Sequence, residues 1–274
     1  MTSHPASASA PDVQPAAVPF HAEARPELTA GRRIGVVLSH GFTGNPASIR
    51  PWAEALAAHG YAVTAPRLPG HGLAGDDWRA MNRTGWEDWY AEVRLAYDTL
   101  VRSCDAIVVG GLSMGGALTL RLAADLALTG EDDLLAGVVV VNPAVATRRL
   151  DAKALPVIKH LVGGLPGIGS DIKRPGALEY AYTRMPLKAT HSMMRAWPGI
   201  VRDLSAIEVP LLYFRSDEDH VVDDLSETLI LRHVGSHDVT LTRLHESYHV
   251  ATLDHDAEQI YAESAAFVAR VAEA

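Results

Sequence analysis

Short runs of consecutive hydrophobic residues alternate along the chain with longer stretches of helical periodicity. One such run, IGVVLS at 34–39, is apolar until its last residue. Continuous runs of this length are typical of strands that are buried on both faces of a parallel sheet. The same reasoning predicts strands over 34–39, 61–65, 105–111, 136–141, 210–215 and 238–244.

Hydrophobic residues that recur three and four positions apart predict helices between these runs. Thr84 and Glu87 have the spacing of a capping box, and the hydrophobic positions from Trp86 to Leu100 follow on one face. The expected helices cover 47–59, 86–100, 113–126, 223–232 and 256–271. Strands that alternate with helices predict an α/β fold with a mostly parallel, doubly wound sheet.

The stretch 144–205 interrupts this alternation. It has no convincing strand, two breaks rich in Gly and Pro, and scattered amphipathic pieces. We expect it to form a small, mostly helical cap over the carboxyl edge of the sheet, where ligands of such folds bind. The core then comprises 20–143 and 206–274, and residues 1–19, rich in Ala, Pro and Ser, form a disordered tail.

The hydrophobic residues of the expected cap have two interpretations. They can form a flexible lid that makes transient contact with lipid surfaces, or they can pack the cap onto the core. Both can hold, because such a lid packs onto the core when it is closed. The residues concerned are Leu150, Leu155, Ile158, Leu161, Val162, Leu165 and Ile168.

Composition narrows the classes of function. The 274 residues are 48% hydrophobic, which is ordinary for one globular domain with a sizeable core. Asp and Glu number 33 against 24 Lys and Arg, and without a dense basic run no nucleic-acid partner is expected. The single cysteine, Cys104, cannot form an internal disulfide. Without a signal-peptide pattern or a hydrophobic run of bilayer length, we expect a soluble, cytoplasmic protein.

Ser113 lies in the pattern G-x-S-x-G, formed by Gly111, Leu112, Ser113, Met114 and Gly115. A predicted strand runs directly into the pattern and a predicted helix leaves it, which is the setting of the nucleophile elbow of α/β hydrolases. The tight turn leaves no room for side chains two positions before and after the serine, where the two glycines stand. We therefore expect Ser113 to be a nucleophile.

Attack on an ester builds negative charge on the carbonyl oxygen, which two backbone N–H groups can stabilise. The N–H of Met114, directly after the nucleophile, is the first expected donor. The second is expected from the loop after strand 34–39, where Phe42 stands in the sequence HGFTG. We expect the neighbouring His40 to pack within that loop and not to act as a base.

A serine needs a general base, and the hydrolase order is serine, acid, histidine. The acid is expected after strand 210–215, where Asp219 and Asp217 are both candidates and Asp219 is favoured. The base is expected after the last strand, with His249 favoured over His245 and His255. Such a set works without a metal or an organic cofactor, and none is expected.

Several segments together resemble the bacterial monoacylglycerol lipases and the similar small carboxylesterases of the α/β-hydrolase superfamily. They are HGFTG (40–44), RLPGHG (67–72), GLSMGG (111–116), GSDIKRPGALEYAYTRMP (169–186), SDEDHVV (216–222) and SYHVATLDHD (247–256). The resemblance implies a triad of Ser113, Asp219 and His249, with oxyanion donors at Phe42 and Met114.

The resemblance also implies that Glu179, in the expected cap, binds the glycerol hydroxyls of the substrate. A carboxylate is a suitable acceptor for a diol, although Glu179 can equally be an ordinary solvated acid. The implied reaction cleaves monoacylglycerols to fatty acid and glycerol through an acyl-enzyme. The alternatives are a broad-specificity carboxylesterase on short-chain esters and a non-catalytic binding protein of the same fold.

Overall fold

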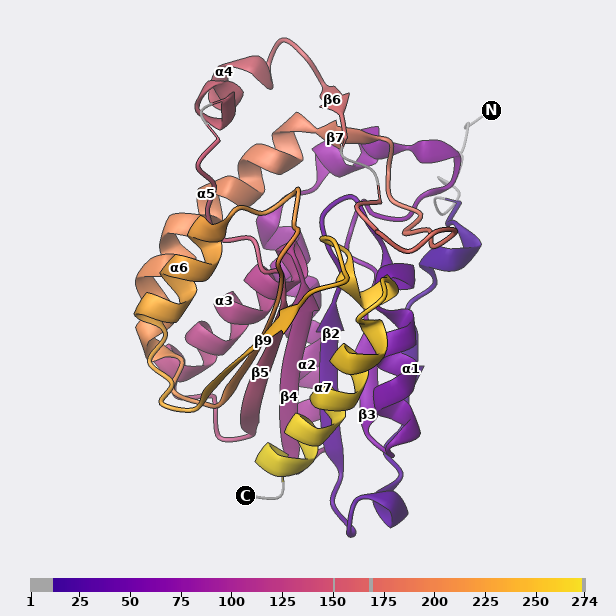
Figure 1. Ribbon diagram of the computed structural model, residues 1–274, viewed down its shortest axis with the longest axis vertical. Helices are drawn as coiled ribbons and strands as arrows, with labels where there is room; N and C mark the ends of the chain where they lie inside the picture. Colours follow the sequence, from indigo (N-terminus) through magenta and orange to yellow (C-terminus); the bar gives the residue numbers. More distant parts are fainter. Residues whose placement is uncertain (1–11, 150, 168–169, 273–274) are drawn as a thin grey trace, which may run out of the picture.

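The computed structural model describes residues 12–149, 151–167 and 170–272, and it contains a seven-stranded sheet of order β1-β3-β2-β4-β5-β8-β9 (Figure 1). Every neighbouring pair is parallel except β1 and β3. The strands are β1 (Phe20–Ala22), β2 (Ile34–Ser39), β3 (Ala62–Ala65), β4 (Ala106–Leu112), β5 (Leu135–Val141), β8 (Leu211–Ser216) and β9 (Val239–Leu244). The expected parallel sheet is confirmed, and β1 adds an antiparallel edge that the sequence pattern did not reveal.

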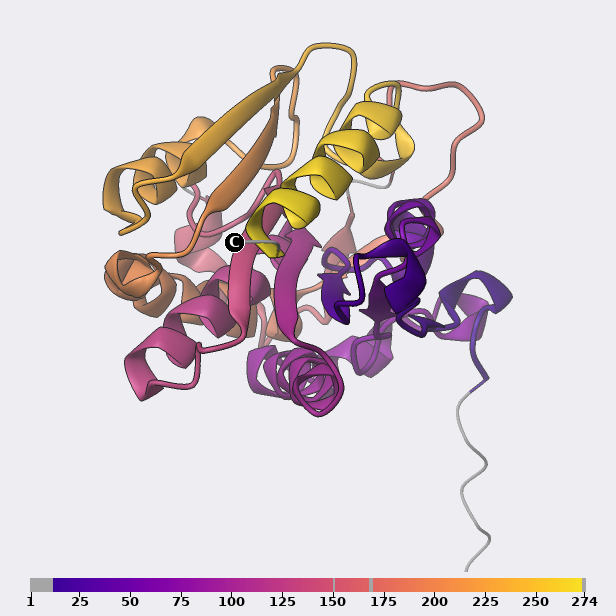
Figure 2. The ribbon, with the colours of Figure 1, turned by 90° about the horizontal axis from the view of Figure 1, so that it is seen from below.

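Helices cover both faces of this sheet (Figure 2). They are α1 (Arg50–Ala58), α2 (Trp86–Val101), α3 (Met114–Thr129), α4 (Leu155–Ile158), α5 (Leu187–Asp203), α6 (Asp224–His233) and α7 (Ala257–Ala272). Within β2, Val36 and Leu38 join the core under α1 and α7, whereas Val37 joins the core under α2 and α3. Both faces of the strand are therefore buried, which explains why its sequence is continuously hydrophobic.

The expected capping box at Thr84 is displaced by one residue. Helix α2 begins at Trp86, and the N–H of Gly85 donates to the Asp88 carboxylate at 2.9 Å. The Thr84 hydroxyl instead donates to the carbonyl oxygens of Pro69 and Met81. Thr84 closes the preceding 3-10 turn and is therefore not available as the cap.

The prediction of a disordered tail to residue 19 is wrong from residue 12 onward. Val13 forms a β-bridge with Leu73, and the N–H of Gln14 donates to the carbonyl oxygen of Gly72 at 2.9 Å. Ala17 is fully buried. These residues find partners in a loop of the core that sequence composition alone does not reveal, and residues 1–11 lie outside the described part of the chain.

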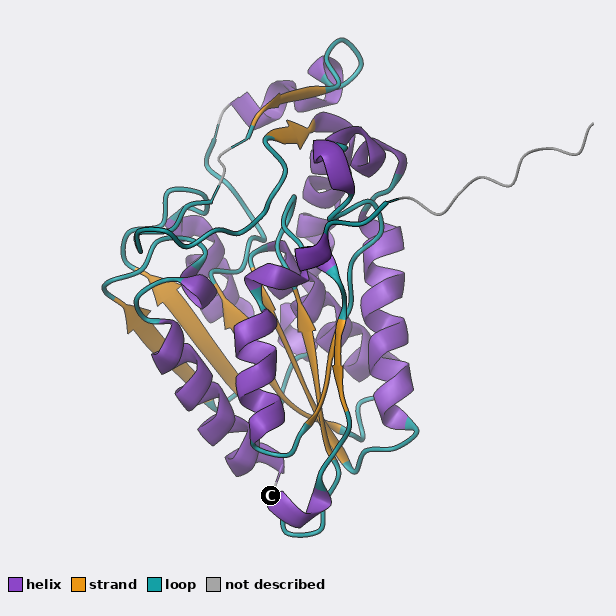
Figure 3. Cartoon of the chain, turned by 90° about the vertical axis from the view of Figure 1, so that its right-hand side faces the viewer, coloured by secondary structure: helices purple, strands orange, loops and turns teal. Residues whose placement is uncertain are grey.

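Residues 144–205, called the insert below, lie between β5 and β8. The insert contains α4, α5 and a two-stranded antiparallel sheet of β6 (Gly164–Pro166) and β7 (Arg184–Pro186). The expectation of no strand is therefore wrong, because strands of three residues that include Gly and Pro carry no recognisable pattern. The strands of the main sheet run toward the end of the molecule that carries α4, β6 and β7 (Figure 3), and α5 packs beside α3.

No helix among the described residues combines the length and hydrophobicity that crossing a bilayer requires.

Candidate active site

Ser113 stands at the sharp turn between β4 and α3. Its backbone has φ 57° and ψ −117°, a strained conformation for a residue with a side chain. A Cβ on Gly111 would lie 2.4 Å from backbone atoms of Gly115, and a Cβ on Gly115 would lie 2.0 Å from the carbonyl oxygen of Ser39. The two glycines are therefore required for the turn to form, as the elbow pattern predicts.

Asp219 and His249 come together from the loops that follow β8 and β9. The Nδ1 atom of His249 lies 3.0 Å from Oδ2 of Asp219, whose side chain is completely buried. The other oxygen, Oδ1, accepts hydrogen bonds from the N–H groups of Val221 and Val222, each at 2.9 Å. This arrangement orients both the carboxylate and the imidazole.

The two groups shift each other's pKa. Burial alone would raise the pKa of Asp219, but the charge and hydrogen bond of His249 and the N–H of Val222 keep that pKa below its ordinary value. Burial alone would lower the pKa of His249, but the charge and hydrogen bond of Asp219 outweigh it and raise that pKa. The carboxylate therefore stays ionised and favours the protonated imidazole.

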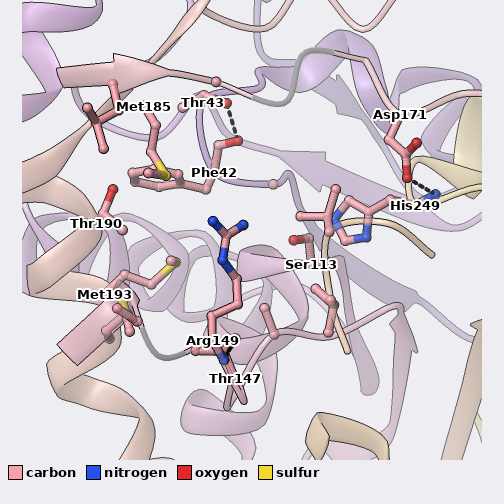
Figure 4. A pocket seen from close by; sticks show the side chains of 18 of the residues that line it. Phe42, Thr43, Ser113, Thr147, Arg149, Asp171, Met185, Thr190, Met193 and His249 are labelled. Atoms are coloured by element: carbon pink, nitrogen blue, oxygen red, sulfur yellow. Dashed lines mark hydrogen bonds between the residues drawn. The ribbon is translucent and has the colours of Figure 1, made fainter. Parts of the chain in front are cut away.

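Ser113 and His249 line the same pocket, and both side chains face it in Figure 4. No hydrogen bond joins their side chains in the described structure. Contacts of this kind are often long in a free enzyme and tighten when substrate binds. The arrangement can deliver an imidazole base to the serine hydroxyl.

The alternative acid and bases lie elsewhere. Asp217 pairs with His245 at 2.5 Å on the surface, where the two side chains are 44% and 71% exposed. His255 is exposed, and its N–H donates to the carboxylate of Asp254. None of these three candidates lines the pocket around Ser113.

The loop HGFTG packs against the serine turn. A Cβ on Gly41 would lie only 3.5 Å from Cβ of Ser113. The N–H of Phe42 has no acceptor among the described residues, and Met114 is the first residue of α3, where N–H groups lack an intrahelical acceptor. Two N–H groups near Ser113 are thus available to a developing oxyanion.

His40 packs within the same loop, as expected. The ring is fully buried, and its Nε2 atom accepts a hydrogen bond from the N–H of Leu68 at 3.1 Å. Its Nδ1 atom lies 2.9 Å from the carbonyl oxygen of Gly41. Burial lowers the pKa of His40 to about 4, so the ring is neutral at physiological pH.

Glu179 reaches the pocket from the insert and is 7% exposed. Its Oε1 atom would lie 2.8 Å from a Cβ on Gly44, so the glycine makes room for the carboxylate. Among the described residues, no group donates a hydrogen bond to that carboxylate. Burial raises the pKa of Glu179 to about 7, against the opposing effect of His249. The carboxyl group is therefore available to hydroxyl donors of a ligand.

The rest of the pocket is largely hydrophobic. The cavity has a volume of about 270 Å³. Its hydrophobic wall comes mainly from the insert and includes Leu155, Ile158, Leu165, Met185, Met193 and Trp197. Such a cavity suits an alkyl chain. Of the hydrophobic residues considered in the expected cap, Leu150 and Ile168 lie outside the described residues.

Two charged residues near the site were not identified from the sequence. Arg215 is buried and donates to Oδ2 of Asp219 at 2.7 Å. Asp171 of the insert accepts a hydrogen bond from the N–H of His249 at 3.2 Å and lies 2.9 Å from Nδ1 of His220. An arginine that ends a buried strand was the available signal for the first, since a buried charge requires a partner. Asp171 carried no signal beyond its place in the segment 169–186.

Within the described residues, no cluster of three or more His, Cys, Asp or Glu side chains is arranged to hold a metal ion.

Comparison with known proteins agrees with this architecture. Residues 36–263 match the model of the alpha/beta hydrolase family. The chain is 41% identical over 258 residues to a thermostable monoacylglycerol lipase of Bacillus sp. (strain H-257), covering 93% of this chain and 95% of that protein. It is 25% identical over 238 residues to a carboxylesterase of Bacillus subtilis (strain 168), covering 86% and 93%. A solved structure from the metagenome-derived lipolytic enzymes LipS and LipT superposes with a TM-score of 0.85 at 38% identity, covering 94% of this chain and 100% of that one. The chain belongs to the alpha/beta hydrolase family.

Proposed function

We propose that the protein is a serine ester hydrolase that cleaves monoacylglycerols to a fatty acid and glycerol. The observation that carries the proposal is the composition of one pocket. Ser113 and His249 line one pocket together with hydrophobic side chains of the insert and with Glu179, a buried carboxylate without a hydrogen-bond donor among the described residues. A monoacylglycerol has the matching parts, an alkyl chain and a diol on either side of one ester. The 41% identity to a monoacylglycerol lipase supports the same conclusion.

In the proposed reaction, His249 accepts the proton of Ser113 while the serine oxygen attacks the ester carbonyl. Asp219 holds the imidazole and stabilises its protonated form. The N–H groups of Phe42 and Met114 stabilise the oxyanion. Glycerol leaves with the proton from His249, and an acyl-enzyme remains. Water then gives a proton to His249 and attacks the acyl carbonyl. The bond between the acyl carbon and the Ser113 oxygen breaks, that oxygen takes the proton back from His249, and the fatty acid is released.

Glu179 accepts hydrogen bonds from the glycerol hydroxyls in this proposal. A carboxyl oxygen can accept in either protonation state, so a pKa of about 7 does not prevent this role. The position of Oε1 against Gly44, in the same loop as Phe42, supports a contact close to the ester.

The insert acts in this proposal as a cap that supplies the wall of the acyl pocket and makes transient contact with lipid surfaces. Exposed hydrophobic side chains support the lipid contact, with Val157 at 67% and Leu161 at 80% exposure. A location in the cytoplasm stays a prediction from the sequence.

Relative turnover of two substrate classes tests the proposal. We expect turnover of monoacylglycerols by the wild type to exceed that of di- and triacylglycerols. Glu179→Gln is expected to reduce monoacylglycerol turnover more than turnover of a short aryl ester. Negligible monoacylglycerol cleavage beside rapid aryl-ester cleavage would favour the second candidate, a broad-specificity carboxylesterase, which the similarity to the carboxylesterase of Bacillus subtilis makes reasonable.

A further inference from the structure

Charge is unevenly divided between the insert and the rest of the chain. The insert, 144–205, contains ten Lys and Arg against four Asp and Glu, whereas the remaining residues contain 14 against 29. All four lysines of the chain lie in the insert: Lys153, Lys159, Lys173 and Lys188. A protein with a formal net charge of −9 therefore carries one segment of opposite sign.

The acids of the insert whose side chains the structure describes do not neutralise its surface. Asp171 is 11% exposed and bonds to the loops of His220 and His249. Glu179 is buried against the pocket, and Asp203 is 11% exposed and paired with Arg121 and Arg202. These are the three acids of the insert whose side chains the structure describes, and all of them point inward.

Hydrophobic and cationic side chains meet on what we call the outer face of the insert. This face consists of Val157, Lys159, Leu161, Val162, Leu165, Arg184 and Lys188. Its four hydrophobic members are between 41% and 80% exposed. It belongs to the end of the molecule that carries α4, β6 and β7 in Figure 1.

Hydrogen bonds hold these segments together. The guanidinium of Arg184 donates to the carbonyl oxygen of Gly164 at 2.7 Å. The N–H of Leu187 donates to the carbonyl oxygen of Gly163 at 3.2 Å. These bonds bring Arg184 and Lys188 beside the turn that follows Leu161 and Val162. The Nζ atom of Lys159 lies 2.8 Å from Nδ1 of His191 in α5.

The cations of the outer face are available to an external anion. Elsewhere in the insert, Arg148 and Lys173 form ion pairs with carboxylates of the core. Lys159, Arg184 and Lys188 have no ion pair with any carboxylate in the described part of the chain.

We infer that the outer face of the insert docks on an anionic lipid surface. Exposed hydrophobic side chains surrounded by Lys and Arg bind such surfaces through burial in the headgroup region and attraction to anionic lipids. The negatively charged core is repelled at the same time, so the insert turns toward the surface. Leu165 is part of the outer face and also lines the pocket, and docking therefore presents the pocket to the lipid. The inference deepens the proposed function and rests on it for its purpose, although docking itself requires no catalysis.

Co-sedimentation with lipid vesicles tests the inference. The protein carries Ser113→Ala, so that the result does not depend on the proposed activity. One set of vesicles contains phosphatidylcholine alone, and the other includes about one third phosphatidylglycerol. At low salt we expect at least about tenfold tighter binding to the anionic vesicles, because several Lys and Arg side chains near such a surface each add to the attraction. High salt is expected to remove the difference.

Two charge-reversed variants locate the surface. Lys159→Glu with Lys188→Glu is expected to lose the preference for anionic vesicles. Arg33→Glu with Arg102→Glu makes the same change of net charge at the opposite end of the sheet. This variant is expected to keep most of the preference for anionic vesicles. As a control, each double variant is also made with the native Ser113. It must then hydrolyse a water-soluble aryl ester at the wild-type rate, which shows that it is folded and that the site is intact.

Three results would overturn the inference. The first is equal binding to neutral and anionic vesicles at low salt. The second is an equal loss of binding in both charge-reversed variants. The third is a dimer of the protein that Lys159→Glu with Lys188→Glu dissociates, without vesicle binding, because the occupant of the face would then be a second copy of the chain.

Discussion

Arg215 donates a hydrogen bond to Oδ2 of Asp219 at 2.7 Å, the same oxygen that lies 3.0 Å from Nδ1 of His249. The carboxylate oxygen that faces the proposed base is thus shared with a permanent cation. A second bond, from Arg215 to the carbonyl oxygen of Val222 at 2.8 Å, holds the guanidinium in place. Because a nearby positive charge disfavours a protonated imidazole, Arg215 moderates the effect of Asp219 on His249.

Replacing Arg215 by Gln is therefore expected to raise the pKa of His249. Since an enzyme with protonated His249 has no base, the acid limb of the kcat/KM profile should move to higher pH. Arg215→Lys keeps the charge and should keep the wild-type profile. The measurement is kcat/KM for an aryl ester between pH 4 and 9.

Arg243 provides the matched control. It is the neighbour of Arg215 across β8 and β9, and both arginines pair with Glu227. Arg243→Gln breaks the same network without touching Asp219, and its profile should match that of the wild type. An equal displacement in both variants would mean that the network, and not the contact with Asp219, sets the pKa.

Replacing Ser113 by Ala should abolish ester cleavage. Loss of the nucleophile in a serine triad lowers kcat by a factor on the order of 10⁶. The check is covalent labelling by a fluorophosphonate probe alongside turnover. Ser103→Ala, at the opposite end of β4, should label normally. Retained activity above a few per cent in the first variant would contradict the assignment of the nucleophile.

Glu179 should lower stability at neutral pH and above. Its folded-state pKa is about 7 and its ordinary value is 4.5, so the unfolded chain loses the proton first as pH rises. The proton-linked stabilisation is complete below pH 4.5 and is lost as pH rises through about 7. At pH 8, Glu179→Gln should thus unfold at a higher temperature than the wild type. Its free energy of unfolding should be greater by up to about 3 kcal/mol. An equal gain at pH 4 would show that charge is not the cause.

Asp171 should act as a positioning residue for His249. Its carboxylate accepts the N–H of His249, and its carbonyl oxygen accepts the N–H of Val250 at 3.0 Å. Asp171→Asn removes a negative charge that raises the pKa of His249, so the acid limb of kcat/KM should move to lower pH. We expect kcat to fall by up to about tenfold, as for one weakened hydrogen bond. His220→Ala, which removes the other partner of Asp171, should leave kcat near wild type.

Gly115→Ala should prevent the elbow from forming. The added Cβ would lie 2.0 Å from the carbonyl oxygen of Ser39, and neither backbone can yield without disrupting β2 or α3. We expect loss of folded protein, measured by thermal unfolding and by the yield of soluble protein. Gly199→Ala is the control, because no atom outside its chain neighbours and the nearby backbone of α5 lies within 4 Å of its Cβ position. That change should stabilise the protein by up to about 1 kcal/mol. Normal folding of the first variant would contradict the tight approach of the two backbones.

The sequence pattern predicted a structural feature correctly where that feature depends only on residues that are close together in the chain. The continuous hydrophobic strands predicted the parallel sheet, because strands buried on both faces need no polar alternation. The elbow at Ser113 was readable because two glycines, a strand and a helix are adjacent in sequence. Strand β1 and residues 12–19 were missed, since their stability depends on distant partners such as β3 and Leu73.

The sequence by itself determined the order of the six parallel strands and five helices of the core, the turn that presents Ser113 and the excess of positive charge in the insert. Only the tertiary structure decided which acid meets which histidine. In the structure Asp217 pairs with His245, whereas Asp219 pairs with His249. Arg215 also contacts the carboxylate of Asp219, and Glu179 lines the pocket. The reason is physical: the pKa of each group depends on burial and on neighbours that lie far away in the chain, and these exist only once the loops have folded together.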